Sequence, residues 1–391
     1  MRRGVDVFKK CRRKTLNTIL YFWEETGNTD KNCRNPYIPS LSNGLKSHGF
    51  LLKGVNYKIS KKELKSLRTS SKIIHLNFLH PFYSGANRKG SVKDVKNMLD
   101  LFSYALSIGY KIIWTFHNIY PHDTRSIDLD SIVRYFVTSN ASAIIAHCPY
   151  AANRCVELFN PKQRPVVIPQ GNYIGYYPNN IGRKDARKRF GFKESDFVFG
   201  FSGNVRSYKG VNNILNTFAK LDDENARLLL NLRVKLKNID EDETTANIEM
   251  KDRLNAKTLE LVNFAEQDPR IKCVLQEWIP NNEYQYFFGA TDVVVFPFKN
   301  ILTSASTMLA LSYAKPVIIP RIGCIPDLVD ETMGELYDAS NPNGLLSSME
   351  KIRNRDIISM GTASYKKAKM CDWKDVGKKT ADVYKNVLHK G

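Results

Sequence analysis

The chain has 391 residues and a formal net charge of +20, with 42% hydrophobic and 25% charged residues. This composition is typical of a soluble globular protein of two or three domains, and it excludes a disordered, collagenous or coiled-coil chain. No uninterrupted apolar run of 18 residues occurs, and the first residues lack the apolar core of a secretory signal. We therefore expect a cytoplasmic protein without a membrane-spanning helix.

The seven cysteines are an odd number, are scattered along the chain and form no CxxC pair. This pattern argues against a disulfide framework and against a zinc site. We expect reduced, mostly buried cysteines.

The positive charge is concentrated in one half of the chain. Residues 1–190 contain 32 Lys and Arg against 12 Asp and Glu, whereas residues 191–391 contain 27 of each. Such asymmetry indicates an anionic partner, which is a nucleic acid, an acidic membrane surface or a phosphorylated substrate. A solvated basic surface is the alternative. Because no nucleic-acid reading motif is visible, we do not expect nucleic acid as a partner.

Short apolar runs alternate with longer amphipathic segments through the first half. The predicted strands are 19–23, 50–52, 73–76, 112–114, 143–146 and 166–168, and the predicted helices lie near 36–48, 93–108, 126–138 and 149–159. Met98, Leu101, Phe102 and Leu106 follow a period close to 3.6. This alternation predicts a parallel sheet covered on both faces.

The same pattern restarts in the second half. The predicted strands are 197–201, 228–234, 273–275, 293–296 and 317–319, and the predicted helices lie near 210–220, 247–267, 281–289, 304–314, 343–353 and 373–389. We therefore expect an α/β fold of two Rossmann-like, doubly wound domains. The expected boundaries are 1–175 and 191–370, with a linker at 176–190 and a C-terminal helix at 371–391. Ligands of such sheets bind at the carboxyl ends of the strands, so the expected site is a cleft between the domains.

The sharpest chemical signal is a glycine-rich loop behind the first strand of the second half. Gly200, Gly203 and Gly210 allow tight turns and close approach of a ligand. Arg206 and Lys209 place two cations beside a helix N-terminus. Fixed charge, free N–H groups and the positive end of the helix dipole suit a diphosphate. An ordinary strand-to-helix turn fits the spacing equally well.

A second loop precedes the helix predicted at 304–314. Thr303, Ser304 and Ser306 are good N-cap residues, and with Ala305 they leave backbone N–H groups accessible to phosphate oxygens. Plain helix capping is the alternative.

Histidines lie at the ends of two predicted strands of the first half or in the loops behind them. His117 shares its loop with His122 and Asp123, and His75 lies close to His80. A histidine at the carboxyl end of a parallel strand points into the cleft, where it can contact a sugar hydroxyl or act as a base. A structural role is the alternative for each one, but their shared position favours a site.

Taken in order, these motifs resemble those of GT-B glycosyltransferases, especially glycosyltransferase family four. Ser202–Gly210 is similar to the family's Gly-x-x-Arg-x-x-Lys-Gly loop, in which the Arg and Lys hold the diphosphate of a nucleotide sugar. Ala290–Pro297 is similar to its "AD-apolar-P" strand, and Ala314–Ile318 to its "G-x-P-V-I" segment. In the first half the resemblance extends to Asn35-Pro36-Tyr37, the His75 strand, the His117 loop, Ile145-Ala146-His147 and Ile168-Pro169-Gln170-Gly171. The resemblance implies a GT-B fold and a donor site formed by Gly203, Arg206, Lys209, Gly210, Thr303, Ser304, Ala305 and Ser306.

One departure from the family bears on mechanism. Retaining members carry Glu-x7-Glu, and the corresponding positions here are Ile301 and Leu309. The run at 302–312 is more similar to a subgroup that builds exopolysaccharide or lipid-linked glycans. Our hypothesis is therefore an inverting hexosyl transfer from a UDP- or GDP-sugar.

An inverting transfer needs a general base for the acceptor hydroxyl and stabilisation of the leaving diphosphate. The candidate bases are His117, His122 and Asp123, with Glu24 and Glu25 as outsiders. For His117 the family instead suggests contact with the donor sugar.

Two further expectations concern the donor. Base selection is expected near Trp278 and Ile279, where backbone contacts leave little side-chain signature. No DxD pair appears at a plausible metal site, so we expect neither an essential metal nor a cofactor besides the nucleotide sugar.

The basic first half is expected to hold the acceptor, a glycan or a polyprenyl-diphosphate-linked molecule. Its charge suits an anionic bilayer, so we expect peripheral association with the cytoplasmic membrane face in polysaccharide biosynthesis. Residues 8–23 fit a first buried strand better than an interfacial helix. A nucleotide-sugar epimerase and a catalytically inactive nucleotide-sugar-binding protein remain alternatives.

Overall fold

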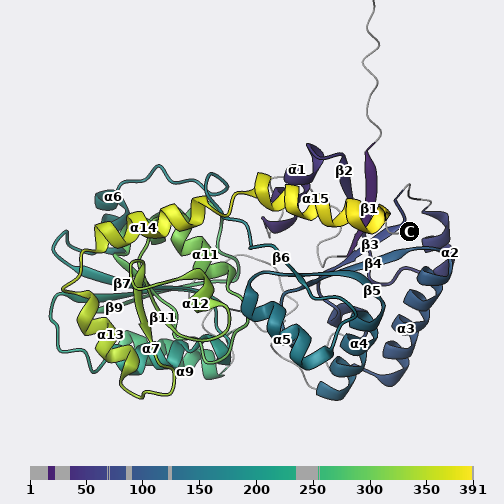
Figure 1. Cartoon of the computed structure of the whole chain (residues 1–391). Coiled ribbons are helices and arrows are strands. Elements are labelled where there is room, and N and C mark those ends of the chain that lie inside the picture. Colours follow the sequence, from purple (N-terminus) through teal and green to yellow (C-terminus); the bar gives the residue numbers. More distant parts are fainter. Residues whose placement is uncertain are drawn as a thin grey trace, which may run out of the picture.

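The computed structural model describes residues 16–22, 36–67, 69, 71–84, 90–121, 126–234, 254 and 256–389. These residues form two α/β lobes that lie side by side (Figure 1). Each lobe contains a six-stranded parallel sheet with flanking helices. The prediction of two doubly wound, Rossmann-like units is confirmed.

The sheet of the first lobe has the strand order β2-β1-β3-β4-β5-β6. Its strands are β1 (Asn17–Phe22), β2 (Phe50–Val55), β3 (Ile73–Leu76), β4 (Lys111–Phe116), β5 (Ala141–Ala146) and β6 (Val166–Val167). Its helices are α1 (Tyr37–Lys46), α2 (Lys61–Ser66), η1 (a 3₁₀ turn, His80–Phe82), α3 (Val92–Ser107), α4 (Ile127–Asn140) and α5 (Pro149–Phe159). Every strand predicted in this half overlaps an observed strand.

The strands of the first lobe are apolar throughout because both faces of the sheet are covered. Leu20 and Phe22 of β1 belong to the core that includes Phe102 of α3. The intervening Ile19 and Tyr21 belong to a separate core on the opposite face. Successive side chains of a strand point to opposite faces, so a strand between two helical layers needs no polar positions.

The last described helix, α15 (Trp373–His389), leaves the second lobe and packs beside α1 on the first lobe (Figure 1). The two helices meet at Gly44 and Gly377, where a Cβ on either residue would lie far inside van der Waals contact with the other helix. At the start of α15, Trp373 packs edge-to-face on Tyr37 and donates a hydrogen bond to the Asn172 carbonyl (2.6 Å). The predicted terminal helix therefore supplies one cover of the first sheet.

The sheet of the second lobe has the strand order β12-β11-β10-β7-β8-β9. Its strands are β7 (Phe197–Asn204), β8 (Ala226–Arg233), β9 (Ile271–Gln276), β10 (Val293–Val295), β11 (Val317–Pro320) and β12 (Gly334–Tyr337). Its helices are α6 (Arg183–Phe190), η2 (a 3₁₀ turn, Ser207–Lys209), α7 (Val211–Phe218), α9 (Ala256–Glu266), α10 (Glu283–Ala290), α11 (Ala305–Ser312), α12 (Ile325–Leu328), α13 (Gly344–Ile352) and α14 (Ile357–Lys369). The sequence did not predict strand β12 of this lobe. Across both lobes it also did not predict the helices α2, α6, α12 and α14.

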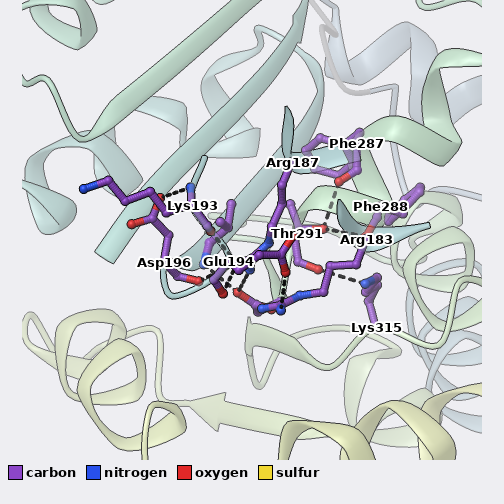
Figure 2. Close-up of polar contacts among 11 residues, drawn as sticks. Arg183, Arg187, Lys193, Glu194, Asp196, Phe287, Phe288, Thr291 and Lys315 are labelled. Atoms are coloured by element: carbon purple, nitrogen blue, oxygen red, sulfur yellow. Dashed lines mark hydrogen bonds and ion pairs between the residues drawn. The ribbon is translucent and has the colours of Figure 1, made fainter. Parts of the chain in front are cut away.

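The second half of the stretch expected to be a linker, 176–190, is helix α6, which packs against α10. Arg187 of this helix is buried and donates to the carbonyls of Lys193, Glu194 and Asp196 (Figure 2). Its guanidinium also lies 2.6 Å from the buried carboxylate of Asp292. This ion pair joins α6 to the sheet, because Asp292 also accepts the backbone N–H of Val198 at the start of β7 (2.7 Å).

Among the described residues, no helix is both long and apolar enough to span a bilayer.

Candidate functional site

A cleft of about 390 Å³ lies between the two lobes. The first lobe contributes the residues after β3 and β4, including Phe78, His117 and Asn118. The second lobe contributes the residues that end β7 and begin α11. The cleft is therefore at the carboxyl ends of the strands, where ligands of parallel sheets bind.

The glycine-rich loop places one of its two cations in this cleft. Lys209 lines the cleft together with Gly203, and its ammonium lies 5.7 Å from the centre of the Phe298 ring. Burial, assisted by the nearby Arg206 charge, lowers the pKa of Lys209 to about 8. An anion entering the cleft would supply an opposite charge and would therefore stabilise the protonated form of Lys209.

Arg206 and Gly210 occupy a different position from Lys209. Both line a neighbouring cavity of about 890 Å³, which lies against α7 and α9. Gly210 has φ +71°, and a Cβ there would overlap the Pro297 carbonyl, so only glycine fits. Arg206 thus acts on the cleft through the pKa of Lys209, and its expected contact with the donor requires its side chain to turn toward the cleft.

The N-terminus of α11 forms another wall of the cleft. Thr303, Ser304, Ala305 and Ser306 all line the cleft. The Ser304 hydroxyl accepts the Thr307 N–H (3.1 Å), which is an N-cap bond. Thr303 donates a hydrogen bond to the His117 carbonyl (3.1 Å), so this turn also contacts the opposite lobe.

The residues expected near the nucleotide base also line the cleft. Trp278 and Ile279 do so, and the Arg233 guanidinium lies 4.4 Å from the centre of the Trp278 ring. A flat indole with a stacked cation is a suitable surface for a nucleobase.

Ile301 and Leu309, at the positions of the family's two glutamates, face this same cleft. No aspartate or glutamate occurs among the described residues that line it. Tyrosines instead form much of the wall, and burial raises the pKa values of Tyr173, Tyr177 and Tyr284. These phenols are therefore neutral hydrogen-bonding groups.

His117 lies in a chain of hydrogen bonds at the first-lobe side of the cleft. Its Nε2 is 3.0 Å from Oδ1 of Asn77, and its Nδ1 is 3.1 Å from Nε2 of His147. Nδ1 of His147 lies 3.0 Å from the Ile168 carbonyl. Burial lowers the pKa of both histidines. Because both ring nitrogens of His117 contact protein atoms, proton abstraction by His117 would break one of these contacts.

Of the other predicted histidines, His80 lines a small cavity together with His117, whereas His75 lies elsewhere in the core. His75 is fully buried, contacting the Tyr384 hydroxyl (2.6 Å) and the Thr115 hydroxyl (2.7 Å), and burial lowers its pKa to about 3. It therefore anchors α15 in the core. His122, Asp123, Glu24 and Glu25 lie outside the described residues.

Two cysteines form a disulfide between the lobes, so the expectation of reduced cysteines is wrong for this pair. Cys148 precedes α5 in the first lobe, and Cys324 precedes α12 in the second. The bond lines a cavity of about 320 Å³ behind the cleft, next to His147. Spacing arguments missed it because the two residues are 176 positions apart.

Sequence reasoning assigned no role to His147, Asn77 or Arg233. His147 follows β5 as His117 follows β4, and these strands are neighbours in the sheet. The shared position of the two histidines was therefore a usable signal. Among the described residues, no group of three or more His, Cys, Asp or Glu side chains is arranged to hold a metal.

Comparisons with known proteins identify the architecture. No family model matches the chain. A D-inositol 3-phosphate glycosyltransferase of Streptomyces bingchenggensis is 24% identical over 259 residues, which are 64% of this chain and 54% of the relative, so the match spans about half of that protein. Sucrose-phosphate synthase of Thermosynechococcus elongatus superimposes with a TM-score of 0.69 at 14% identity, over 96% of this chain and all of the other. Anabaena HepE, solved in complex with UDP-glucose, superimposes with a TM-score of 0.66 at 12% identity, over 95% of this chain and all of the other.

The chain has the GT-B fold. The relative just named is a glycosyltransferase by name, and HepE was solved with a nucleotide sugar, UDP-glucose. Within the GT-B fold the cleft described above lies between the two Rossmann-like domains, as expected from the sequence.

Proposed function

We propose that this chain transfers a hexosyl group from a nucleoside diphosphate sugar to a hydroxyl group of a glycan or lipid-linked acceptor. The observation that carries the proposal is a single cleft lined by Lys209, the N-terminus of α11 and the Trp278–Arg233 stack. Lys209 and the N-terminus of α11 suit the diphosphate, which they would contact from two sides. The Trp278–Arg233 stack suits the base. HepE, a neighbour of this fold, binds UDP-glucose, which supports a nucleoside diphosphate sugar as the donor, and we propose a UDP- or GDP-sugar.

The leaving diphosphate would be stabilised by groups that are already in place. The Lys209 ammonium provides a charge in a buried environment, and the 303–306 turn provides backbone N–H groups at a helix N-terminus. Because these donors are fixed before the reaction, they need no reorganisation when negative charge develops on the leaving group. The proposal requires no metal ion, since the lysine and the helix supply the neutralising charge.

We propose inversion because the two acidic positions of retaining relatives are Ile301 and Leu309, which line the cleft. Inversion requires a base for the acceptor hydroxyl. His117 is engaged at both ring nitrogens, so the proposal favours His122 or Asp123, a few residues further along the sequence, as the base.

We also propose that the basic first half holds the acceptor at an anionic membrane on the cytoplasmic side. The support is its excess of lysine and arginine, which attract acidic lipids by about 1 kcal/mol per residue near the surface. Flotation with acidic liposomes should decrease as salt is raised, and flotation that is independent of salt would contradict this interaction.

The experiment that tests the main proposal is a binding screen followed by a transfer assay. UDP-, GDP- and ADP-sugars are first compared by the thermal shift that each produces, since a ligand at 100 times its dissociation constant adds about 2.7 kcal/mol of stability. The best donor is then incubated with lipid-linked and glycan acceptors in excess EDTA, and the anomeric configuration of the product is read by NMR. Failure of every nucleotide sugar to bind would refute the proposal, and a retained anomeric configuration would refute inversion alone.

A further inference from the structure

His117 and His147 form a continuous chain of hydrogen-bonding groups. The number of protons that this chain needs can be counted from its contacts. The chain runs from the Ile168 carbonyl through His147 and His117 to Oδ1 of Asn77. Its three contacts measure 3.0, 3.1 and 3.0 Å. Each of these contacts is within ordinary hydrogen-bonding distance.

Both ends of this chain can only accept hydrogen bonds. The Ile168 end is a backbone carbonyl. At the other end, Nδ2 of Asn77 donates to the Phe22 carbonyl (3.1 Å), and Oδ1 accepts the Tyr21 hydroxyl (3.1 Å). These two contacts fix the orientation of the amide, because a flipped Asn77 would place its oxygen against the Phe22 carbonyl.

Two neutral imidazoles cannot satisfy three contacts that end on acceptors. Each neutral ring carries one N–H, so the pair has two protons for three hydrogen bonds. One contact is then left between a nitrogen lone pair and another acceptor. If the pair carries one additional proton, all three contacts become hydrogen bonds, and the pair is a monocation.

Burial opposes this additional proton while the cleft holds no anion. It lowers the pKa of both rings, and for His117 the charges of His147 and His75 act in the same direction. No described acidic side chain lines the cleft to compensate a cation. An anion that enters the cleft would therefore change the protonation state of the pair, because it supplies the missing opposite charge.

The two rings of the pair line different cavities. His117 lines the cleft between the lobes, whereas His147 lines the cavity of about 320 Å³ behind it. The hydrogen bond between the rings connects these two spaces. Both ring nitrogens of His147 are engaged, by the Ile168 carbonyl and by His117, so a proton that enters from this cavity must first displace one of these contacts.

We propose that the His117–His147 pair takes up one proton when a nucleoside diphosphate sugar binds, and that His147 is the positioning residue that makes this uptake possible. The proposal rests on the proposed function, since it needs a diphosphate in the cleft. It gives the pair the role of a positive charge that exists only in the donor complex. Lys209 differs, because its pKa of about 8 keeps it largely charged at pH 7.

Other titratable or charged groups also face the pair. They are Tyr37 of α1, His75 of β3, Lys209 across the cleft, His80 and Arg134 on the side of α4, and Asp327 and Lys367 in the cavity behind His147. Burial raises the pKa of Tyr37, which is therefore neutral near pH 7. Asp327 and Lys367 are joined by a hydrogen bond from the lysine to the Asp327 carbonyl (3.3 Å).

The test is isothermal titration calorimetry at pH 7.0 in buffers of different ionisation enthalpy, with UDP-glucose, GDP-mannose and ADP-glucose as probes. In these sugars both phosphates are esterified, so they lack the second phosphate ionisation near pH 6 that would obscure the result. The Lys209→Arg background removes the titration of Lys209. We expect the uptake of close to one proton per bound nucleotide sugar in the parent chain and in this background.

His147→Asn should abolish the uptake while binding is retained at reduced affinity. His48→Gln, which removes a histidine remote from the cleft, is the matched control and should leave the uptake unchanged. Ring ¹⁵N NMR of the parent, with and without the nucleotide sugar, reports the same proton and does not depend on a variant that folds.

Each outcome has a distinct meaning. Uptake in the parent that is lost in His147→Asn, or imidazolium signals that appear with the ligand, supports the proposal. Tight binding with no proton uptake and unchanged ¹⁵N shifts overturns this proposal and leaves the proposed function intact. Absence of binding by all three nucleotide sugars overturns both.

Discussion

Lys209 is a buried cation of the cleft, and replacing it with methionine should weaken nucleotide-sugar binding by a definable amount. Methionine retains much of the length and the packing against the Phe298 ring, but it removes the charge. A hydrogen bond to a charged group contributes about 1.5–3 kcal/mol. This range corresponds to a roughly 10- to 150-fold increase in the dissociation constant.

The pH dependence of binding follows from the lowered pKa of Lys209. Burial and then the Arg206 charge bring this pKa to about 8, and only the protonated amine attracts a diphosphate. The charged fraction falls from about nine-tenths at pH 7 to about one-tenth at pH 9, so the titration of Lys209 alone should lower affinity about tenfold over that interval. Lys209→Arg should remove this contribution, because an arginine stays charged throughout the range, and a decrease that remains in this variant reports the proton taken up by the His117–His147 pair.

The assay is calorimetric titration with the best nucleotide sugar at pH 7, 8 and 9, on the parent, Lys209→Met and Lys209→Arg. Lys220→Met, which removes an exposed lysine remote from the cleft, serves as the control and should bind as the parent does. If Lys209→Met binds as tightly as the parent, Lys209 does not contact the diphosphate. A parent affinity that is constant from pH 7 to pH 9 would show that its pKa lies outside this interval.

Three further predictions concern stability. Dithiothreitol should lower the thermal midpoint of the parent to that of Cys148→Ser and leave this variant unchanged, because both then lack the Cys148–Cys324 link between the lobes; an equal response of the two proteins would argue against the bond. Gly44→Ala places a methyl group against the first turn of α15 and should reduce the unfolding free energy by about 1–3 kcal/mol in urea, so an unchanged midpoint would contradict the close helix contact. Asp292→Asn leaves the buried Arg187 charge uncompensated and should remove about 3–5 kcal/mol in the same assay, and a much smaller loss would mean that water reaches the pair.

The strands could be predicted from sequence because most of them are continuous apolar runs between two helical layers. β12 was not predicted because its apolar run is interrupted by Glu335, whose carboxylate pairs with Arg355 (2.7 Å). Helix α6 was not predicted for a related reason. Its strongly basic sequence was assigned to a surface linker, but Arg187 is neutralised by Asp292, which lies 105 residues further along the chain. Local patterns do not reveal a partner at that distance.

The parts of the cleft that come from single loops were also accessible to sequence reasoning. Lys209, the 303–306 turn and Trp278 line the cleft, and Ile301 and Leu309 face it as the comparison of motifs implied. The placement of Arg206 in the adjacent cavity was not predictable, because spacing does not fix the direction of a flexible side chain.

Contacts between separate loops of the chain required the folded structure. The His117–His147 contact joins residues that follow two different strands, and its proton count depends on Asn77, which follows a third strand. The Cys148–Cys324 bond depends on how the lobes lie against each other. Neither relationship has a local spacing that could indicate it.

The return of α15 to the first lobe has a consequence for how this protein is made. Ile19 and Tyr21 of the first strand share their core with Val376 and Tyr384, so part of one face of the first sheet remains uncovered until α15 has left the ribosome. The first lobe therefore cannot complete its folding before the second lobe has been synthesised. Nascent chains of increasing length should gain protease resistance in the second lobe before the first, the reverse of their order in the gene.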